Sequence, residues 1–499
     1  MTQLIVVFCI GLSGCMNNLQ SLDEELPNIV LILADDMGYG DAGCYNPVSK
    51  ILTPNIDRLA SEGILFTDAH TPSSVCTPTR YGLLTGRYCW RTRLKKGVIL
   101  GYDETPLIEK GRETIGSILQ KKGYETACIG KWHVGMNWQT KGDYVIRNDS
   151  NKWQNYSGIF KENEENIDFM KPASGGPNEL GFDYSFITLG CSTSDNPYCF
   201  IENQKTVGIP SLMLAEKWIG KPGVVTARMV PDWSMEDVDP IFTEKAIEFI
   251  RQHEEKSADD PFFLYLALSS PHIPFLPPDF TKGKSDEGPR GDLVMVVDWS
   301  VGQIEKTLEK YGLGRNTLLI FTSDNGPRRG GNGHMSAGGF RGYKANIWEG
   351  GHRVPFIARW PGKISPGTQS DQTISLTDML ATFASLTGQD PAGKAGEDSY
   401  NILPTFFGET IGNDKTRIFH SASGVFAIRK GKWKLIEGTK GSGSGRLNLT
   451  TDSLEKVGQL YDLENDPYET NDLFDQETEI VKELRNILNQ KRANNASIE

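Results

Sequence analysis

Four continuous apolar segments, each followed at once by polar residues, constrain the fold more than any other feature of this sequence. They occupy residues 29–33, 126–129, 262–268 and 318–321. Apolar runs that do not alternate with polar residues are typical of strands covered on both faces, as in a parallel sheet beneath helices. Helical patterns between them, at 55–63, 113–123, 242–253 and 301–311, predict that strands and helices alternate. The sequence therefore predicts an α/β sandwich.

Charged or polar side chains follow every one of these predicted strands. In an open α/β sheet, ligands bind beyond the carboxyl ends of the strands. Ordinary turn residues are the alternative, but the pattern occurs four times, which favours a functional site. The candidate residues found in this way are Asp35, Asp36, Lys131, His133, His272, Asp324 and Asn325.

Four of these candidates, Asp35, Asp36, Asp324 and Asn325, offer only oxygen donors. Oxygen ligands without an adjacent histidine or thiolate select Ca²⁺ or Mg²⁺ over zinc. Three carboxylates at one edge of a sheet would also repel one another unless a cation held them together. Each pair alone fits common turn chemistry, but together they predict a site for a hard cation.

A second candidate centre is the segment Cys76-Thr77-Pro78-Thr79-Arg80. Pro78 suits the first turn of a helix, where its missing N–H costs nothing. A helix that starts near Thr77 puts Cys76 at its N-terminus, where unbonded amides and the helix dipole favour an anion. Arg80 lies on the same helix face and can bind a sulfate or phosphate through two N–H groups. The segment predicts an anion pocket that holds a reactive group; a buried structural cysteine is the alternative.

The same segment resembles the signature of the type I sulfatases, a family of the alkaline phosphatase superfamily. Residues 76–80 followed by Thr85-Gly86 match their C-x-P-x-R…TG pattern, in which the cysteine is oxidised to Cα-formylglycine. Further blocks resemble the family in the same order along the chain, at 34–41, 130–133, 181–183, 271–274, 322–326, 341–344, 348–355, 427–435 and 460–467. The resemblance implies a large mixed, mostly parallel sheet sandwiched by helices (alkaline phosphatase-like), with a smaller C-terminal α+β subdomain made of an antiparallel sheet and one helix.

The resemblance also implies an activity, the hydrolysis of sulfuric esters. Matched by position, Ca²⁺ (or Mg²⁺) would be held by Asp35, Asp36, Asp324, Asn325 and an oxygen of modified Cys76, and the pocket would be completed by Arg80, Lys131, His133, His272 and Lys344. One hydroxyl of the hydrated aldehyde would attack sulfur, and His133 would deprotonate the other so that sulfate leaves. His272 would protonate or stabilise the departing alcohol, and the three basic side chains and the metal would neutralise charge on the sulfuryl oxygens. A maturation enzyme that oxidises Cys76 would be a required partner.

Three further residues are candidates for substrate contact. His334 and Arg353 lie near the pocket blocks in the sequence. The family places a serine after its block at 181–183, and Ser192 or Ser194 is the candidate here, although the local sequence departs from the family. Cys191 and Cys199 are candidates for a disulfide across the same loop. The stretches 138–155, 183–215 and 216–235 are predicted to be loop insertions that set specificity.

The N-terminus predicts export. Residues 4–12 are apolar but too short to span a bilayer, and 12–15 resemble a bacterial lipobox with Cys15 as the lipidated residue. Residues 1–15 would be the signal peptide, 16–26 a tether, 27–410 the catalytic domain and 411–499 the C-terminal subdomain. We expect a bacterial protein of the periplasm or outer membrane surface that contacts the membrane only through its lipid anchor.

The net charge of the chain limits which classes of molecule it is expected to bind. Lys+Arg 52 against Asp+Glu 64 gives a formal net charge of −12, which argues against nucleic-acid binding. Six basic residues and no acidic ones nevertheless lie from position 80 to 96, namely Arg80, Arg87, Arg91, Arg93, Lys95 and Lys96. This run is either a solvated helix face or an electrostatic funnel for a sulfated polymer.

The function predicted from these features is the removal of sulfate from a sulfated oligo- or polysaccharide. Hexosamine 6-O-sulfate is favoured through the likeness to hexosamine-6-sulfatases. Two alternatives stay open. One is a phosphonate monoester or phosphodiester hydrolase of the same superfamily, and the other is a non-catalytic glycan-binding lipoprotein.

Overall fold

The computed structural model describes residues 25–102, 105–147, 159–389, 395–412, 415–438 and 458–494. The predicted signal peptide, the lipobox and most of the predicted tether lie outside these ranges. Within them, none of the helices is both long enough and apolar enough to cross a membrane.

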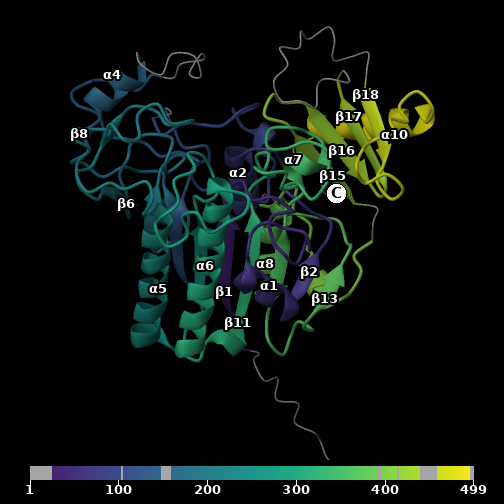
Figure 1. The fold of residues 1–499 in the computed structure, drawn as a ribbon, viewed down its shortest axis with the longest axis horizontal. Helices are drawn as coiled ribbons and strands as arrows, with labels where there is room; N and C mark the ends of the chain where they lie inside the picture. The colour runs from purple at the N-terminus through teal and green to yellow at the C-terminus, as the bar shows by residue number, and fades with distance from the viewer. Residues whose placement is uncertain are drawn as a thin grey trace, which may run out of the picture.

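A ten-stranded sheet forms the centre of the molecule (Figure 1). Its five central strands run parallel in the order β11-β1-β10-β4-β5, and the next strand on each side attaches to them by an antiparallel pairing. The predicted mixed, mostly parallel sheet is therefore confirmed. The central strands are β11 (Thr317–Ser323), β1 (Asn28–Ala34), β10 (Phe262–Ala267), β4 (Glu125–Lys131) and β5 (Tyr184–Thr188), and the outer strands are β12 (Phe356–Arg359), β2 (Ile64–Phe66) and β13 (Thr368–Ser370) on one side and β6 (Ile201–Glu202) and β7 (Lys205–Thr206) on the other.

Helices cover both faces of this sheet. Alternate residues of β1 point to opposite sides: Ile29 and Leu31 join one apolar core, and Val30 and Ile32 join the other. Because both faces are buried, every position of the strand must be apolar, which explains the continuous runs in the sequence. The first core is shared with α2 (Cys76–Thr85), α3 (Ile115–Gln120) and α8 (Met379–Leu386), and the second with α1 (Pro54–Ser61), α5 (Val238–Ser257) and α6 (Pro289–Lys310).

One predicted insertion is wrong in part. The stretch 183–215 contains β5, which pairs in parallel with β4 inside the central sheet, and β6 and β7, which extend the sheet to its edge. Four of the five residues of β5 are buried. The strand was missed because it is short and carries Ser185 and Thr188 among its apolar residues, so it lacks a continuous apolar run.

The C-terminal part forms a second, antiparallel sheet with one helix packed on it, as predicted. Its strands are β15 (Thr416–His420), β16 (Phe426–Lys430), β17 (Trp433–Glu437) and β18 (Gly458–Asp462), and its helix is α10 (Thr478–Ala493). Val481, Leu484 and Leu488 of the helix are buried against the sheet, together with Tyr88 and Trp90 of the large domain. The subdomain therefore shares its core with the segment that follows α2.

Several short elements complete the described chain. They are β3 (Ala69–His70), β14 (Ile374–Ser375), β8 (Leu212–Met213), β9 (Arg228–Met229), α4 (Ile159–Asn166), α7 (Glu349–His352), α9 (Leu403–Phe406) and the 3₁₀ helices at Cys89–Arg91, Pro177–Glu179, Gly314–Asn316 and Leu376–Asp378.

A buried charge network fastens the C-terminal sheet to the large domain. Lys434 of β17 is fully buried, and its Nζ lies 2.9 Å from a carboxylate oxygen of Glu349 and 2.8 Å from one of Glu469. The same Nζ is 3.0 Å from Nε2 of His352. A charge buried this deeply is tolerated only while its partners are present.

We predict that Lys434→Ala destabilises the protein by about 3–5 kcal/mol, because it leaves the buried carboxylate of Glu469 without its counter-charge. Lys430 on the neighbouring strand is the matched control, since its ion pair with Glu483 is exposed. Lys430→Ala should cost less than about 1 kcal/mol. Chemical denaturation of both variants measures the difference, and equal losses would contradict this account of the interface.

Candidate active site

The polar residues that follow the central strands meet at one edge of the sheet. The strand register pairs Ala34 with Ser323, Leu33 with Ala267, and Ala267 with Gly130, so the four strands end at nearly the same level. The backbone N–H of Asp324 donates to the carbonyl of Ala34 at 3.0 Å. Parallel pairing thus places the residues of four distant segments in one cluster.

Each of three buried carboxylates in this cluster has its own basic partner. Lys131 Nζ lies 2.6 Å from Asp35 Oδ2, and Lys344 Nζ lies 2.6 Å from Asp36 Oδ1. Asp324 Oδ2 accepts from Nε and Nη2 of Arg80, at 3.0 and 2.8 Å. The three negative charges are therefore balanced by three positive ones within the protein.

Arg80 has a different role from the one expected. Its remaining bond runs from Nη1 to the backbone carbonyl of Lys131 at 2.7 Å, and its side chain is fully buried. The guanidinium thus positions Asp324 and the end of β4, whereas the sequence suggested a direct contact with the sulfuryl group.

Burial disfavours the charged form of two of these carboxylates even with their basic partners in place. Burial raises the pKa of Asp35, and burial together with the neighbouring Asp35 raises the pKa of Asp324 to about 7. Burial acts on Asp36 as well, but Lys344 and then His272 lower its pKa by more. Two of the three carboxylates are thus destabilised as anions, which is the electrostatic condition for binding a cation.

The oxygen atoms that a metal would use are free. Asp35 Oδ1, Asp36 Oδ2 and Asn325 Oδ1 are buried and have no hydrogen-bond partner among the described residues. Asn325 Nδ2 donates to Asp36 Oδ1 at 2.8 Å, which directs its own Oδ1 away from that contact. Unpaired buried oxygens are costly in a protein interior. Oxygens of this kind are the ligands of Ca²⁺ and Mg²⁺, so the residues present fit a hard divalent cation.

Cys76 lies beside this cluster as the first residue of α2, with 2% of its surface exposed. Its Sγ, the Sγ of Cys191 and a ring nitrogen of His133 lie within 4.8 Å of one another. A hydrogen bond from Cys191, followed by the charges of Lys131 and His133, lowers the pKa of Cys76 well below its ordinary value. The predicted nucleophile is therefore held where an anion is stabilised.

Two histidines present unprotonated nitrogens to the same space. His133 Nε2 is 2.9 Å from the carbonyl of Ile99, which can only accept, so Nε2 carries the proton and Nδ1 faces Cys76 and Cys191. By the same reasoning, His272 Nδ1 donates to the carbonyl of Ile273 at 2.7 Å. Its Nε2 is left 3.9 Å from Asp36 Oδ2 and 3.8 Å from Cys191 Sγ. Burial lowers the pKa of both, in His272 to about 3.

The backbone is strained at two of these residues. Asp36 and His133 have φ values of 67° and 55°, in the left-handed region that side chains rarely adopt. Such strain persists only where the surrounding structure enforces it, and it gathers at functional sites.

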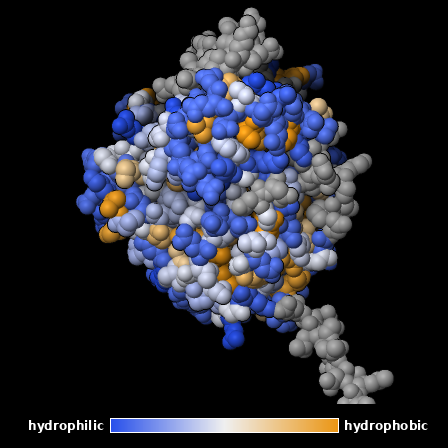
Figure 2. All heavy atoms as spheres, turned by 90° about the vertical axis from the view of Figure 1, so that its right-hand side faces the viewer, coloured by the Kyte–Doolittle hydropathy of each residue, from blue (hydrophilic) through white to orange (hydrophobic). Residues whose placement is uncertain are grey.

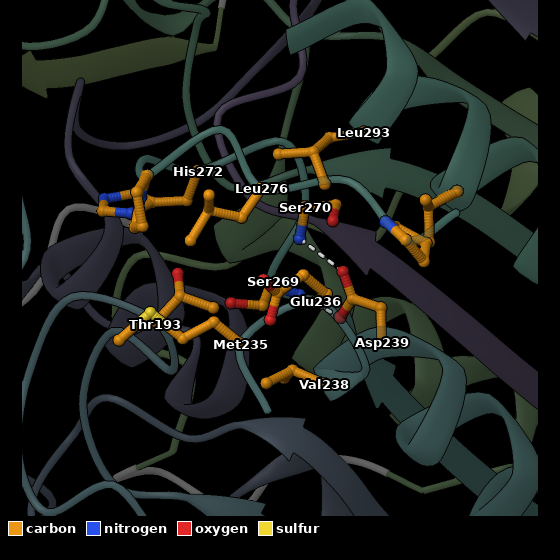
Figure 3. Close-up of a pocket in the computed structure, with 13 residues that line it drawn as sticks. Thr193, Met235, Glu236, Val238, Asp239, Ser269, Ser270, His272, Leu276 and Leu293 are labelled. Atoms are coloured by element: carbon orange, nitrogen blue, oxygen red, sulfur yellow. Dashed lines mark hydrogen bonds between the residues drawn. The ribbon is translucent and has the colours of Figure 1, made fainter. Parts of the chain in front are cut away.

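A buried carboxylate holds the turn that presents His272 (Figure 3). Asp239, in the first turn of α5, accepts the backbone N–H groups of Ser269 and Ser270, both at 2.7 Å. A cavity of about 10 Å³, the room of a single water molecule, lies between Asp239 and His272. Asp239 is thus a positioning residue for His272.

The three predicted substrate contacts are engaged elsewhere. His334 Nε2 lies 2.9 Å from Oδ1 of Asp41, which also pairs with Arg290. Arg353 donates to the carbonyl of Thr67 and pairs with Glu349. The hydroxyl of Ser192 bonds to that of Thr188 at 2.6 Å. Each of these side chains stabilises a local connection of the fold, and its contact with substrate stays a prediction.

Sequence reasoning also missed two residues of the site. The first is Cys191, which contacts Cys76 and both histidines. Cys191 and Cys199 are free thiols, so the predicted disulfide between them is wrong. Arg328 is 43% exposed and its Nε lies 3.8 Å from Asp36 Oδ2. Its position shortly after the 322–326 block was the signal that could have identified it.

Comparison with known proteins decides the family. The family description "Sulfatase" matches residues 27–389, and "N-sulphoglucosamine sulphohydrolase, C-terminal" matches residues 340–494. The chain belongs to the sulfatase family. It is 34% identical to N-acetylgalactosamine-6-O-sulfatase of Bacteroides thetaiotaomicron, over 96% of each chain. It is 32% identical to human arylsulfatase A, over 90% of this chain and 83% of the relative.

A solved structure agrees with these relatives. It comes from work on glycosaminoglycan metabolism by Bacteroides thetaiotaomicron and superposes with a TM-score of 0.79 at 31% identity, covering 94% of this chain and all of that one. This sulfatase is therefore a sulfuric ester hydrolase.

We predict that the two histidines His272 and His334 respond to substitution in opposite ways. His272→Gln removes a group that faces the carboxylate cluster and should lower kcat/KM for sulfate-ester hydrolysis about 100-fold or more, with little change in Tm. His334→Gln weakens the buried contact to Asp41. It should lower Tm while leaving kcat/KM within about twofold of the wild-type value. Steady-state kinetics and calorimetry on both variants test the assignment, which fails if His334→Gln is the catalytically damaged one.

Proposed function

We propose that this sulfatase removes sulfate from a sulfated carbohydrate, with hexosamine 6-O-sulfate as the favoured group, using a formylglycine made from Cys76 and a bound Ca²⁺. The observation that carries the proposal is the position of Cys76, next to His133 and beside a buried cluster in which Asp35, Asp36 and Asn325 each have an unpaired oxygen. The name of the relative N-acetylgalactosamine-6-O-sulfatase supports the choice of sugar.

In this proposal Asp35, Asp36, Asp324 and Asn325 hold the cation. When bound, Ca²⁺ supplies positive charge that attracts the sulfate ester and favours an ionised oxygen at residue 76. Lys131 and Lys344 stand beside the same carboxylates and neutralise two of them. Because the three internal ion pairs already cancel, a dication leaves the pocket with net positive charge for an anionic substrate.

Oxidation of Cys76 explains how sulfate is released. A hydrated aldehyde has two hydroxyl groups on one carbon, one able to attack sulfur and the other able to expel sulfate, whereas a thiol offers no second step. His133 is placed to take a proton at residue 76, because its Nδ1 is unprotonated and its Nε2–H is fixed on Ile99.

His272 is placed for the leaving alcohol. Its neutral Nε2 faces the pocket, and a bound sulfate ester would bring negative charge next to it, which raises the pKa of a histidine. A protonated Nε2 can then donate to the departing oxygen. Asp239 keeps the turn of His272 in place through Ser269 and Ser270.

The test of the nucleophile is mass spectrometry on the native-host protein. The peptide that contains Cys76 should be lighter by about 18 Da, from loss of sulfur and two hydrogens and gain of a carbonyl oxygen. Cys76→Ala should abolish turnover, while Cys128→Ala, at another buried thiol, should retain it. A fully mature protein with an unmodified thiol, or desulfation that survives Cys76→Ala, would contradict the proposal.

The same experiments separate the alternatives. A phosphodiester or phosphonate hydrolase would show a higher kcat/KM on phosphodiesters than on matched sulfate esters. A non-catalytic glycan-binding protein would turn over neither ester. Desulfation of defined sulfated mono- and disaccharides then identifies the sugar and the sulfate position.

Ca²⁺ binding can be tested separately from activity. After treatment with a chelator, added Ca²⁺ should raise Tm. At a free Ca²⁺ concentration of 100 times Kd, binding should raise the free energy of unfolding by about 2.7 kcal/mol. Asn325→Ala removes one unpaired oxygen and should weaken Ca²⁺ binding about 10-fold to 100-fold. Asn332→Ala, whose side chain bonds only to loop carbonyls, is the control. Titration calorimetry measures both, and equal affinities would remove Asn325 from the ligand set.

The N-terminal segment supports a location for this sulfatase outside the cytoplasmic membrane. The apolar segment at 4–12 and the lipobox-like residues 12–15 support export and a lipid anchor at Cys15 at the envelope of a bacterium. An enzyme tethered there would meet extracellular glycans. The test of the anchor is labelling with a radioactive lipid. The label should enter the wild-type chain and should be absent from Cys15→Ser.

A further inference from the structure

A basic groove lies where the large domain meets the C-terminal subdomain, outside the catalytic cluster. Its volume is about 510 Å³. Five of its lining residues are basic and no carboxylate lines it. Figure 2 looks onto the side of the molecule that carries the C-terminal subdomain, and hydrophilic side chains cover most of that side. The basic residues of the groove are Arg87, Arg91, Lys95, Lys96 and Arg492.

These cations are not equivalent. Arg91 donates from Nε and Nη2 to the two carboxylate oxygens of Asp398, and Arg87 pairs with Glu109 and Glu397. Lys95 and Lys96 are exposed: the Nζ of Lys95 donates to a backbone carbonyl, and no ion pair joins Lys96 to any described residue. In a protein of net charge −12, two adjacent lysines without counter-charges form a local anion site.

Two aromatic residues, Trp90 and Phe426, are among the lining residues of the same groove. Phe426 packs edge-on against Trp90, with ring centroids 5.5 Å apart, and the guanidinium of Arg492 lies 4.4 Å above the Phe426 ring. Trp90 is buried beneath the guanidinium of Arg91, which lies 4.3 Å from its ring centroid, so the half-buried Phe426 supplies the apolar surface beside the lysines. A sulfated sugar has both anionic groups and apolar C–H faces, so it matches such a combination. Polyanions without such faces, including DNA, would use the charges alone.

The groove is joined to the active site through the backbone. Lys96 is two residues from Val98, a span of at most about 7 Å, and Val98 packs in one apolar cluster with Cys76. The next residue, Ile99, supplies the carbonyl that fixes His133. The backbone that carries the two groove lysines therefore continues directly into residues that pack against Cys76 and fix His133.

We propose that this groove is a second binding site for a sulfated glycan, which holds parts of the polymer outside the catalytic pocket through Lys95 and Lys96. The inference rests on the proposed action on a sulfated carbohydrate and adds that the substrate is longer than one or two sugars. Part of the basic run found in the sequence thus acts as a polymer site, while Arg80, Arg87 and Arg91 serve structural pairs.

The test compares two double variants with the same change in charge. Lys95→Gln/Lys96→Gln alters the groove, and Lys121→Gln/Lys122→Gln alters another exposed lysine pair at the end of α3. Both are made in the Cys76→Ala background, and binding of dextran sulfate is measured by titration calorimetry at low salt. We expect the groove variant to bind about tenfold more weakly, since exposed charge contacts are individually modest, and the control to bind as before.

A second measurement uses the active enzyme. With residue 76 intact, the groove variant should show a raised KM on a sulfated polysaccharide and an unchanged KM on a sulfated monosaccharide. Unchanged dextran sulfate affinity, an equal loss in the control pair, or an equally raised KM on the monosaccharide would overturn the proposal. So would equally tight binding of duplex DNA. Lysine-dependent binding by a protein that desulfates no sugar would instead refute the proposed function, so the two failures are distinguishable.

Discussion

The burial of three carboxylates at one edge of the sheet is the constraint on which the rest of the structure depends. A buried carboxylate without a counter-charge costs several kcal/mol, so Asp35, Asp36 and Asp324 can share this space only while other groups compensate them. The compensating cations come from α2, from the end of β4 and from the loop that carries Lys344. Each of these elements is therefore fixed by its charge as well as by its apolar contacts, and together they surround Cys76.

The sequence alone was sufficient to predict this cluster because of how parallel sheets are built. A strand buried on both faces leaves a continuous apolar run, and parallel strands end at the same edge, so residues that follow different runs must meet. Asp35, Lys131 and Asp324 were found in this way, from segments up to about 290 residues apart. The helix N-terminus at Cys76 followed from an equally local pattern.

The contacts that the sequence did not predict belong to residues chosen by closeness in the sequence. His334 and Arg353 lie near motif residues along the chain, but a loop turns within a few residues, and their side chains bond to Asp41 and Thr67. Cys191 was passed over in favour of Ser192, although the two are adjacent, because the direction of a side chain in an irregular loop depends on contacts from other segments. The role of Arg80 was missed for the same reason, since its partner Asp324 is 244 residues away.

The C-terminal subdomain belongs to the catalytic unit because it holds the segment that leads into Cys76. The backbone of His420, at the end of β15, accepts the N–H of Ser74 and donates to the carbonyl of Pro72, two bonds of 3.2 Å. The turn after β15 continues this contact, since Ala422 bonds to Gly97 on one side and to Ala345 on the other. The loops that carry Cys76, Lys344 and the two groove lysines thus share one backbone connection. A glycan seated against that turn would lie on the same rigid support as the nucleophile, which is how a second binding site can hold its substrate in register with the chemistry.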